Sequence, residues 1–172
     1  MRRLINAGEG HVGNIKTIEE MCAAIKNGVR CAVVTGTAGT GKTTLIRDLV
    51  PTLSAMRYDV KLLVPTGRAA KMIQVRTGHP ASTIHSAIFH IADKPFEDVD
   101  GTIRWQFPLK DDHPARTVFI VDEASMVGTG LHNDGILEFG TGSLLQDLLD
   151  YSGIRRFRFR LTANCIDVPR MR

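Results

Sequence analysis

The chain has 172 residues, which is the size of one domain and is long enough to form a hydrophobic core. It is 43% hydrophobic, and no run approaches 18 apolar residues, so we expect neither a membrane-spanning helix nor a membrane partner. The net charge of +4 comes from residues 153–172, which carry six arginines and one aspartate and leave −1 on the preceding residues. The basic composition therefore does not indicate a nucleic-acid-binding groove in the body of the chain.

The N-terminal residues and the cysteines bear on the compartment. Residues 1–9 contain no apolar segment of the kind found in a signal peptide. Cys22, Cys31 and Cys165 are odd in number and far apart, which argues against a disulfide framework and against a zinc site. We therefore expect a cytoplasmic protein.

An amphipathic helix is predicted over residues 14–27, because apolar side chains recur there at helical spacing. Thr17 and Glu20 are placed as a capping box at its start. Asn27 and Gly28 form a stop signal at its end, and a strand is predicted directly afterwards, over residues 30–35.

The next stretch, from Gly36 to Thr43, matches the phosphate-binding pattern G-x-x-x-x-G-K-[ST]. Its glycines allow positive φ, so backbone N–H groups turn inward and form a phosphate cradle with the helix N-terminus that follows. Lys42 would contact the β- and γ-phosphates, and the Thr43 hydroxyl would bind Mg²⁺, which prefers oxygen ligands. A chance match occurs in about 1% of chains of this length. We assign nucleotide binding to Gly36, Thr37, Ala38, Gly39, Thr40, Gly41, Lys42, Thr43 and Thr44.

Strands and helices alternate along the rest of the chain. Pro51 favours an early end to the helix that follows the glycine-rich loop. The alternation predicts an α/β fold, a P-loop NTPase with a parallel sheet and helices on both faces. The elements are expected as a helix over 42–53, a strand over 60–64, a turn at 65–70 and a helix to 76, a loop over 77–81, a short helix opening at 82–86, a strand over 117–121 and a helix over 143–151.

Residues 92–112 differ in character from this alternation. Asp100 and Gly101 form a turn signal between two possible strands, which predicts a small inserted β-hairpin. Trp105 is expected to pack within that hairpin, with base stacking as the less favoured alternative. We expect residues 1–153 to form one domain and residues 154–172 a basic tail.

Two carboxylates follow the apolar strand at 117–121. Asp122 is placed to complete the Mg²⁺ shell, and Glu123 to orient or deprotonate the attacking water as a general base. We expect this strand to lie beside the strand that precedes the glycine-rich loop. The alternative is a strand that simply ends at two solvated acids.

Three sets of residues together resemble one family. Residues 36–43 look like its Walker A loop, residues 64–71 with 82–85 look like its motifs Ia and Ib, and residues 122–126 look like its Walker B motif. The set resembles RecD-like DNA helicases of superfamily one, over about residues 13–152. The resemblance implies a RecA-like ATPase domain that binds ATP and Mg²⁺ and couples hydrolysis to movement along single-stranded DNA.

The resemblance also implies a nucleic-acid path across the ends of two strands. Pro65, Thr66, Gly67 and Arg68 would line the single strand, with Thr83 and His85 beside it. Hydroxyl and N–H donors at these positions would bind phosphates without selecting a base sequence. The alternatives are that Pro65–Gly67 only makes a tight turn, that Arg68 caps a helix, and that His85 is a structural side chain.

Two departures from the family limit what is expected. The first glutamine is Gln74, so the adenine-reading glutamine near the N-terminus of these helicases has no counterpart. From about residue 154 the chain does not continue into the family's Gly-Asp-x-x-Gln-Leu-Pro-Pro segment. We hypothesise that these residues are not ancestral, as after a frameshift or early stop. The alternative is a genuine edge strand or basic arm.

The expected function is the ATP-binding motor domain of a RecD-like helicase, truncated before the second motor domain. Such a chain should bind ATP and Mg²⁺ and show weak or no hydrolysis and no unwinding alone. The alternative is a non-catalytic ATP-binding module, or remnant, that acts with a second RecA-like chain. A small-molecule kinase is a weaker option, because no lid segment is evident.

Overall fold

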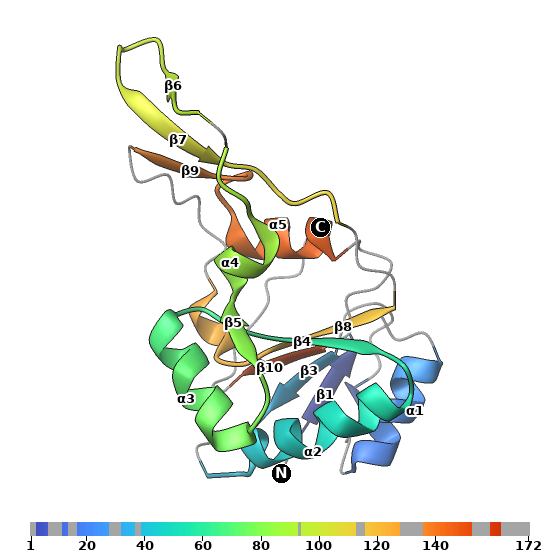
Figure 1. Cartoon of the computed structure of the whole chain (residues 1–172). Helices are drawn as coiled ribbons and strands as arrows, with labels where there is room; N and C mark the ends of the chain where they lie inside the picture. Colours follow the sequence, from blue (N-terminus) through green and yellow to red (C-terminus); the bar gives the residue numbers. More distant parts are fainter. Residues whose placement is uncertain are drawn as a thin grey trace.

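A seven-stranded sheet forms the base of the structure (Figure 1). The structure is a computed structural model, and it describes residues 3–6, 12–13, 17–27, 32–36, 39–92, 94–112, 116–127, 136–152 and 159–162. The strand order is β2-β1-β3-β10-β8-β4-β5. Strand β1 pairs antiparallel with β2 and β3, and the other neighbours pair in parallel. The strands are β1 (Arg3–Asn6), β2 (Val12–Gly13), β3 (Ala32–Thr35), β4 (Asp59–Val64), β5 (Ala81–Thr83), β8 (Thr117–Val121) and β10 (Phe159–Thr162).

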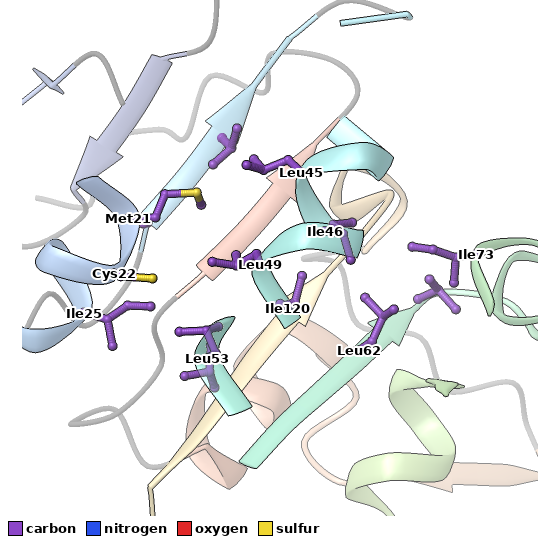
Figure 2. Packing of buried hydrophobic residues seen from close by; sticks show 14 of the residues in the cluster. Met21, Cys22, Ile25, Leu45, Ile46, Leu49, Leu53, Leu62, Ile73 and Ile120 are labelled. Atoms are coloured by element: carbon purple, nitrogen blue, oxygen red, sulfur yellow. The ribbon is translucent and has the colours of Figure 1, made fainter. Parts of the chain in front are cut away.

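Helices cover both faces of this sheet, as the sequence predicted. The helices are α1 (Ile18–Lys26), α2 (Lys42–Ala55), α3 (Gly67–Thr77), α4 (Ile84–Ile88) and α5 (Leu144–Tyr151), with a 3₁₀ turn η1 at Ala124–Met126. Alternate residues of β8 enter different cores: Val118 and Ile120 pack with α1, α2 and α3, whereas Phe119 and Val121 pack with α4 and α5. Figure 2 shows the first core, where Leu45, Ile46, Leu49 and Leu53 of α2 lie over Leu62 and Ile120.

Helix α1 begins with the predicted capping box. The Glu20 amide donates to Thr17 Oγ1 at 3.3 Å, and the Thr17 amide donates to Glu20 Oε2 at 3.3 Å. Asn27 is the C-cap. Residues 14–16 and Gly28, at the outer limits of the predicted segment, lie outside the described residues.

Helix α2 continues through Pro51 to Ala55, so the expectation that this proline favours an early end was wrong. Proline has no amide to donate to the carbonyl four residues earlier, which here is that of Arg47. His79 Nε2 lies 3.0 Å from that carbonyl oxygen. The carbonyl thus has a substitute partner, and the helix persists.

The predicted loop at 77–81 and the helix expected from residue 82 are also corrected. Ala81–Thr83 is strand β5, which pairs in parallel with Leu62–Val64 of β4. Helix α4 begins only at Ile84, because Thr83 is extended and caps it by accepting from the Ser86 amide at 3.1 Å.

Strand β10 corrects two expectations. It pairs with Val33 of β3 and with Val121 of β8 through Arg160, so β8 is not the direct neighbour of β3. A strand with neighbours on both sides is central, which contradicts the alternative of an edge strand in the tail. Backbone pairing with both neighbours determines the position of this strand, and the arginine-rich sequence of the tail does not reveal it.

A second sheet of three strands stands at one end of the molecule, with α4 and α5 between it and the large sheet (Figure 1). Its order is β6 (Phe96–Glu97), β7 (Ile103–Phe107) and β9 (Leu137–Phe139). Strands β6 and β7 are antiparallel around Gly101, which has φ 73°, and Trp105 lies half-buried opposite Leu137. Strand β9 lies between the predicted strand at 117–121 and the predicted helix at 143–151, where the sequence predicted no element.

Candidate functional site

The glycine-rich loop joins β3 to α2, and α2 begins at Lys42 as predicted. Gly39 and Gly41 have φ of 78° and 77°, a conformation that strains any other residue. Gly36 is needed for space instead, because a Cβ there would come within 2.6 Å of Thr40 Oγ1. Thr37 and Ala38 lie outside the described residues.

Lys42 reaches back across this loop. Its ammonium donates to the carbonyl oxygen of Gly36 at 2.7 Å. Lys42 and Thr43 are half-buried, whereas Thr44 is exposed. A flexible lysine beside the N-terminus of a 14-residue helix, next to glycines with positive φ, fits a phosphate group.

Asp122 and Glu123 lie at the end of β8. The Asp122 amide donates to the carbonyl of Leu63 at 3.0 Å, which fixes the strand end against β4. Burial raises the pKa of Asp122, and the Glu123 charge raises it further, against the lowering effects of the Glu123 amide and of the charges on Lys42 and Arg76. Lys42 therefore acts electrostatically on Asp122, although the two residues are far apart in sequence.

Glu123 has a left-handed backbone, with φ 53° and ψ 35°. This conformation costs energy for a residue other than glycine and is common at functional sites. Its carbonyl accepts from the Met126 amide at 2.9 Å, which closes η1 directly after the two acids. The turn therefore fixes the backbone of Glu123 at the carboxyl end of the strand.

A magnesium ion would find oxygen donors in the Thr43 hydroxyl and the Asp122 carboxylate. These are the hard ligands that Mg²⁺ takes, usually together with phosphate oxygens and water. Within the described residues no three His, Cys, Asp or Glu side chains form a cluster that could hold a metal by themselves.

The candidate nucleic-acid residues lie at the ends of two paired strands. Val64 of β4 is opposite Thr83 of β5, so residues 65–68 and 83–85 meet at one edge of the sheet. This is the carboxyl edge, where Gly36 and Asp122 also follow their strands, and where open α/β sheets bind ligands.

The threonines of this edge are already engaged as helix caps. Thr66 Oγ1 accepts from the Ala69 amide at 3.2 Å, so Thr66 rather than Arg68 caps α3. Thr83 Oγ1 donates to Ser86 Oγ at 2.9 Å. Arg68 is exposed, and a Cβ on Gly67 would meet no atom within 4 Å, so this turn has room for a ligand.

His85 is half-buried among aromatic rings. Its ring lies 5.0 Å from Phe139 and 5.9 Å from Phe89 between centroids. Burial lowers the pKa of His85, which favours the neutral imidazole. His85 can therefore pack as a structural side chain and also lie beside the proposed path of single-stranded DNA.

Two further polar residues were not found from the sequence. Asp147 is fully buried and accepts from the Thr141 amide at 3.0 and 3.2 Å, and a Cβ on Gly140 would collide with its carboxylate. Tyr151 donates to Asp112 at 3.1 Å, and burial together with that carboxylate raises the pKa of Tyr151 to about 12. Both contacts hold loops around the second core, and neither has a local sequence signal.

Comparisons with known proteins agree with the geometry. A family model described as an AAA domain matches residues 18–136. The ATP-dependent RecD2 DNA helicase of Deinococcus radiodurans is 29% identical over 113 residues, which cover 60% of this chain and 13% of that helicase. Together these similarities support the resemblance to a RecD-like helicase ATPase domain. No helix in the described part of the chain is long and apolar enough to cross a membrane.

Proposed function

The chain belongs to the AAA domain family, and we propose that it is the ATP-binding motor domain of a RecD-like DNA helicase. The proposal rests chiefly on one observation. Lys42 lies across the glycine-rich loop that follows β3, and Asp122 follows β8, which runs parallel to β3 in the same sheet. The two segments, 80 residues apart in the sequence, thus lie at one edge of the sheet, which supports a site for a charged phosphate and a cation.

In this proposal the chain's own groups divide the work on ATP. The loop amides and the N-terminus of α2 would bind the phosphates, and Lys42 would exchange the Gly36 carbonyl for phosphate oxygens. Thr43 and Asp122 would hold Mg²⁺, which when bound offsets the charge of the β- and γ-oxygens. Glu123 would accept a proton from the attacking water.

Single-stranded DNA is the proposed second ligand. Pro65, Thr66, Gly67 and Arg68, with Thr83 and His85, would contact its phosphates and sugars from the same edge of the sheet. Related phosphoryl-transfer enzymes gain roughly 10³–10⁵ in rate from an arginine supplied by another domain or chain. We therefore expect the 172-residue chain tested alone to bind Mg-ATP and to hydrolyse it slowly.

The test is a thermal melt with and without Mg-ATP. Ligand at about 100 times its dissociation constant stabilises the folded chain by ~2.7 kcal/mol, which raises the melting temperature by several degrees. Lys42→Ala should lose this increase, whereas Lys26→Ala, an exposed lysine on α1, should keep it. A cooperative melt that Mg-ATP does not shift would contradict the proposal.

A second assay separates a motor from a module that only binds ATP. Steady-state hydrolysis is measured with and without an oligodeoxythymidine. DNA-stimulated hydrolysis that Glu123→Gln removes, with Mg-ATP binding retained, supports the motor. Binding with no hydrolysis under either condition supports the non-catalytic module that acts with a partner chain.

A further inference from the structure

Helix α2 contains a proline at a position where a helix normally donates a hydrogen bond. The residue four positions before Pro51 is Arg47, whose carbonyl would accept that bond. Such a carbonyl in a continuous helix needs another donor, or it remains unpaired. The helix nevertheless extends four residues past the proline, to Ala55.

His79 supplies the donor from a different part of the chain. Its Nε2 lies 3.0 Å from the Arg47 carbonyl oxygen. A carbonyl oxygen only accepts hydrogen bonds, so this contact requires a proton on Nε2. Both the neutral Nε2–H tautomer and the charged imidazolium meet that requirement.

The backbone around His79 is held for this contact. Gly78 ends α3 with φ 75°, and its amide donates to the Gln74 carbonyl at 2.8 Å. The buried Thr77 hydroxyl accepts from the His79 amide at 3.2 Å and donates to the Ile73 carbonyl at 2.8 Å. The imidazole is thus presented by a fixed turn.

The contact joins elements that lead to both candidate sites. Helix α2 begins at Lys42, in the proposed phosphate site. Strand β5 begins at Ala81, two residues after His79, and its last residue Thr83 caps α4 beside His85. This hydrogen bond therefore adds a directional link, beside the shared apolar core, between the nucleotide-binding helix and the strand that ends at the proposed nucleic-acid edge.

We propose that the His79 Nε2–H replaces the missing Pro51 amide and that this bond couples nucleotide binding to nucleic-acid binding, with His79 as a positioning residue. The inference deepens the proposed function and rests on it for the identity of the two ligands. A shift of α2 on nucleotide binding would reach β5 through this bond. Reciprocally, DNA bound at the end of β5 would act on α2.

The experiment uses the full chain and measures its affinity for Mg²⁺ with a non-hydrolysable ATP analogue. The dissociation constant is determined with and without a saturating oligodeoxythymidine, and the ratio is the coupling factor. The variants are His79→Leu, which removes the donor, and His79→Gln, which retains one. Pro51→Ala, alone and combined with His79→Leu, gives the helix its own amide. Chemical denaturation of each protein gives the folding equilibrium constant.

We expect a coupling factor of about 5 or more in the wild type and in His79→Gln. His79→Leu should bring the factor close to one and should lower the folding equilibrium constant by about five- to tenfold. The double variant should recover stability, because the helix supplies the missing donor, while the coupling remains lost. That combination separates the role in coupling from a merely structural one.

Three results would overturn the proposal. The coupling factor of His79→Leu could equal that of the wild type, the double variant could regain coupling together with stability, or the wild type could bind both ligands without coupling. A wild type that binds neither ligand would instead contradict the proposed function and remove the coupling with it. The folding equilibrium constants of the wild type, His79→Leu, Pro51→Ala and the double variant would still show whether His79 and Pro51 interact.

Discussion

Individual side chains at the candidate nucleotide site are held in states that a ligand would change. Lys42 donates to the Gly36 carbonyl, a neutral acceptor that a phosphate oxygen would replace with a stronger, charged one. Glu123 keeps a left-handed backbone that costs energy and is offset in part by the turn that it starts at η1. Burial raises the pKa of Asp122 and so disfavours its charged form. A bound cation would offset the charge of Asp122, and a phosphate would give Lys42 a charged acceptor.

Replacing Asp122 with asparagine should raise the stability of the chain without ligand and reduce its stabilisation by Mg-ATP. Because burial raises its pKa, its contribution to stability is present at low pH and is lost as the pH rises through the raised value. Asp122→Asn removes the charge and keeps an oxygen that accepts from the Glu123 amide. At about pH 7 the variant without ligand should melt above the wild type, and the difference should vanish near pH ~4. Mg-ATP should then stabilise the variant less than the wild type.

Asp48→Asn is the matched control for this prediction. Its hydrogen bond with Arg47 lowers the pKa of Asp48, so its contribution to stability is present at neutral pH and is lost as the pH falls. The control should therefore melt slightly below the wild type at about pH 7, with an unchanged response to Mg-ATP. Melting curves across this pH range check both signs. An Asp122→Asn variant less stable than the wild type at neutral pH would contradict the argument.

At the scale of elements, local signals and distant pairing differ in how far they can be predicted. The capping box of Thr17 and Glu20 and the buried run of β8 are set by neighbouring residues, so the sequence predicted α1 and β8. Strands β5, β9 and β10 are three or four residues long and depend on partners elsewhere in the chain. Short strands defined by partners leave only a weak local pattern.

Strand β10 provides the prediction at this scale. Arg160 pairs with both Val33 and Val121, so a proline there removes an amide from the middle of the sheet. Arg160→Pro leaves a strand carbonyl of the sheet without its donor, so it should cost about 1–3 kcal/mol and lower the midpoint of denaturation. Arg160→Ala keeps the amide and is the control. Equal midpoints for the two variants would show that β10 is not a central strand in solution.

At the scale of the whole molecule, the candidate site residues carry a local sequence signal, whereas the contacts that support them do not. Gly36 to Thr43 and Asp122 could be assigned because a fixed spacing carries their chemistry. Asp147 and Phe139 could not be assigned from the sequence. The Asp147 carboxylate accepts from the Thr141 amide, and the Phe139 ring packs between the two sheets, and both roles arise only when the chain is folded. The same holds for His79, whose partner is a backbone carbonyl 32 residues away.

Phe139 joins the small sheet to the rest of the molecule. Its ring stacks on Phe107 at 4.4 Å between centroids, within the small sheet, and lies 5.4 Å from Phe89 and 5.0 Å from His85 beside the large one. Arg104 also links β7 to Glu138 of β9, at 3.5 Å, but this is a partly exposed ion pair of low energy. The aromatic cluster therefore links the two sheets through side chains, beside backbone hydrogen bonds such as those from the His90 amide to Pro108 and from the Lys110 amide to Ile88.

Phe139→Ala should weaken this connection more than it weakens the large sheet. Truncating a fully buried phenylalanine costs about 3–5 kcal/mol, and Phe139 is half-buried, so a loss near the lower end is expected. Amide hydrogen exchange should speed up in β6, β7 and β9 while β4 and β8 stay protected, because parts of a protein with few buried contacts open separately. Val99→Ala, at the fully exposed tip of the small sheet, should change neither region. If β4 and β8 exchange faster to the same degree as β7, the two sheets unfold as one cooperative unit, and the small sheet cannot move independently of the nucleotide site.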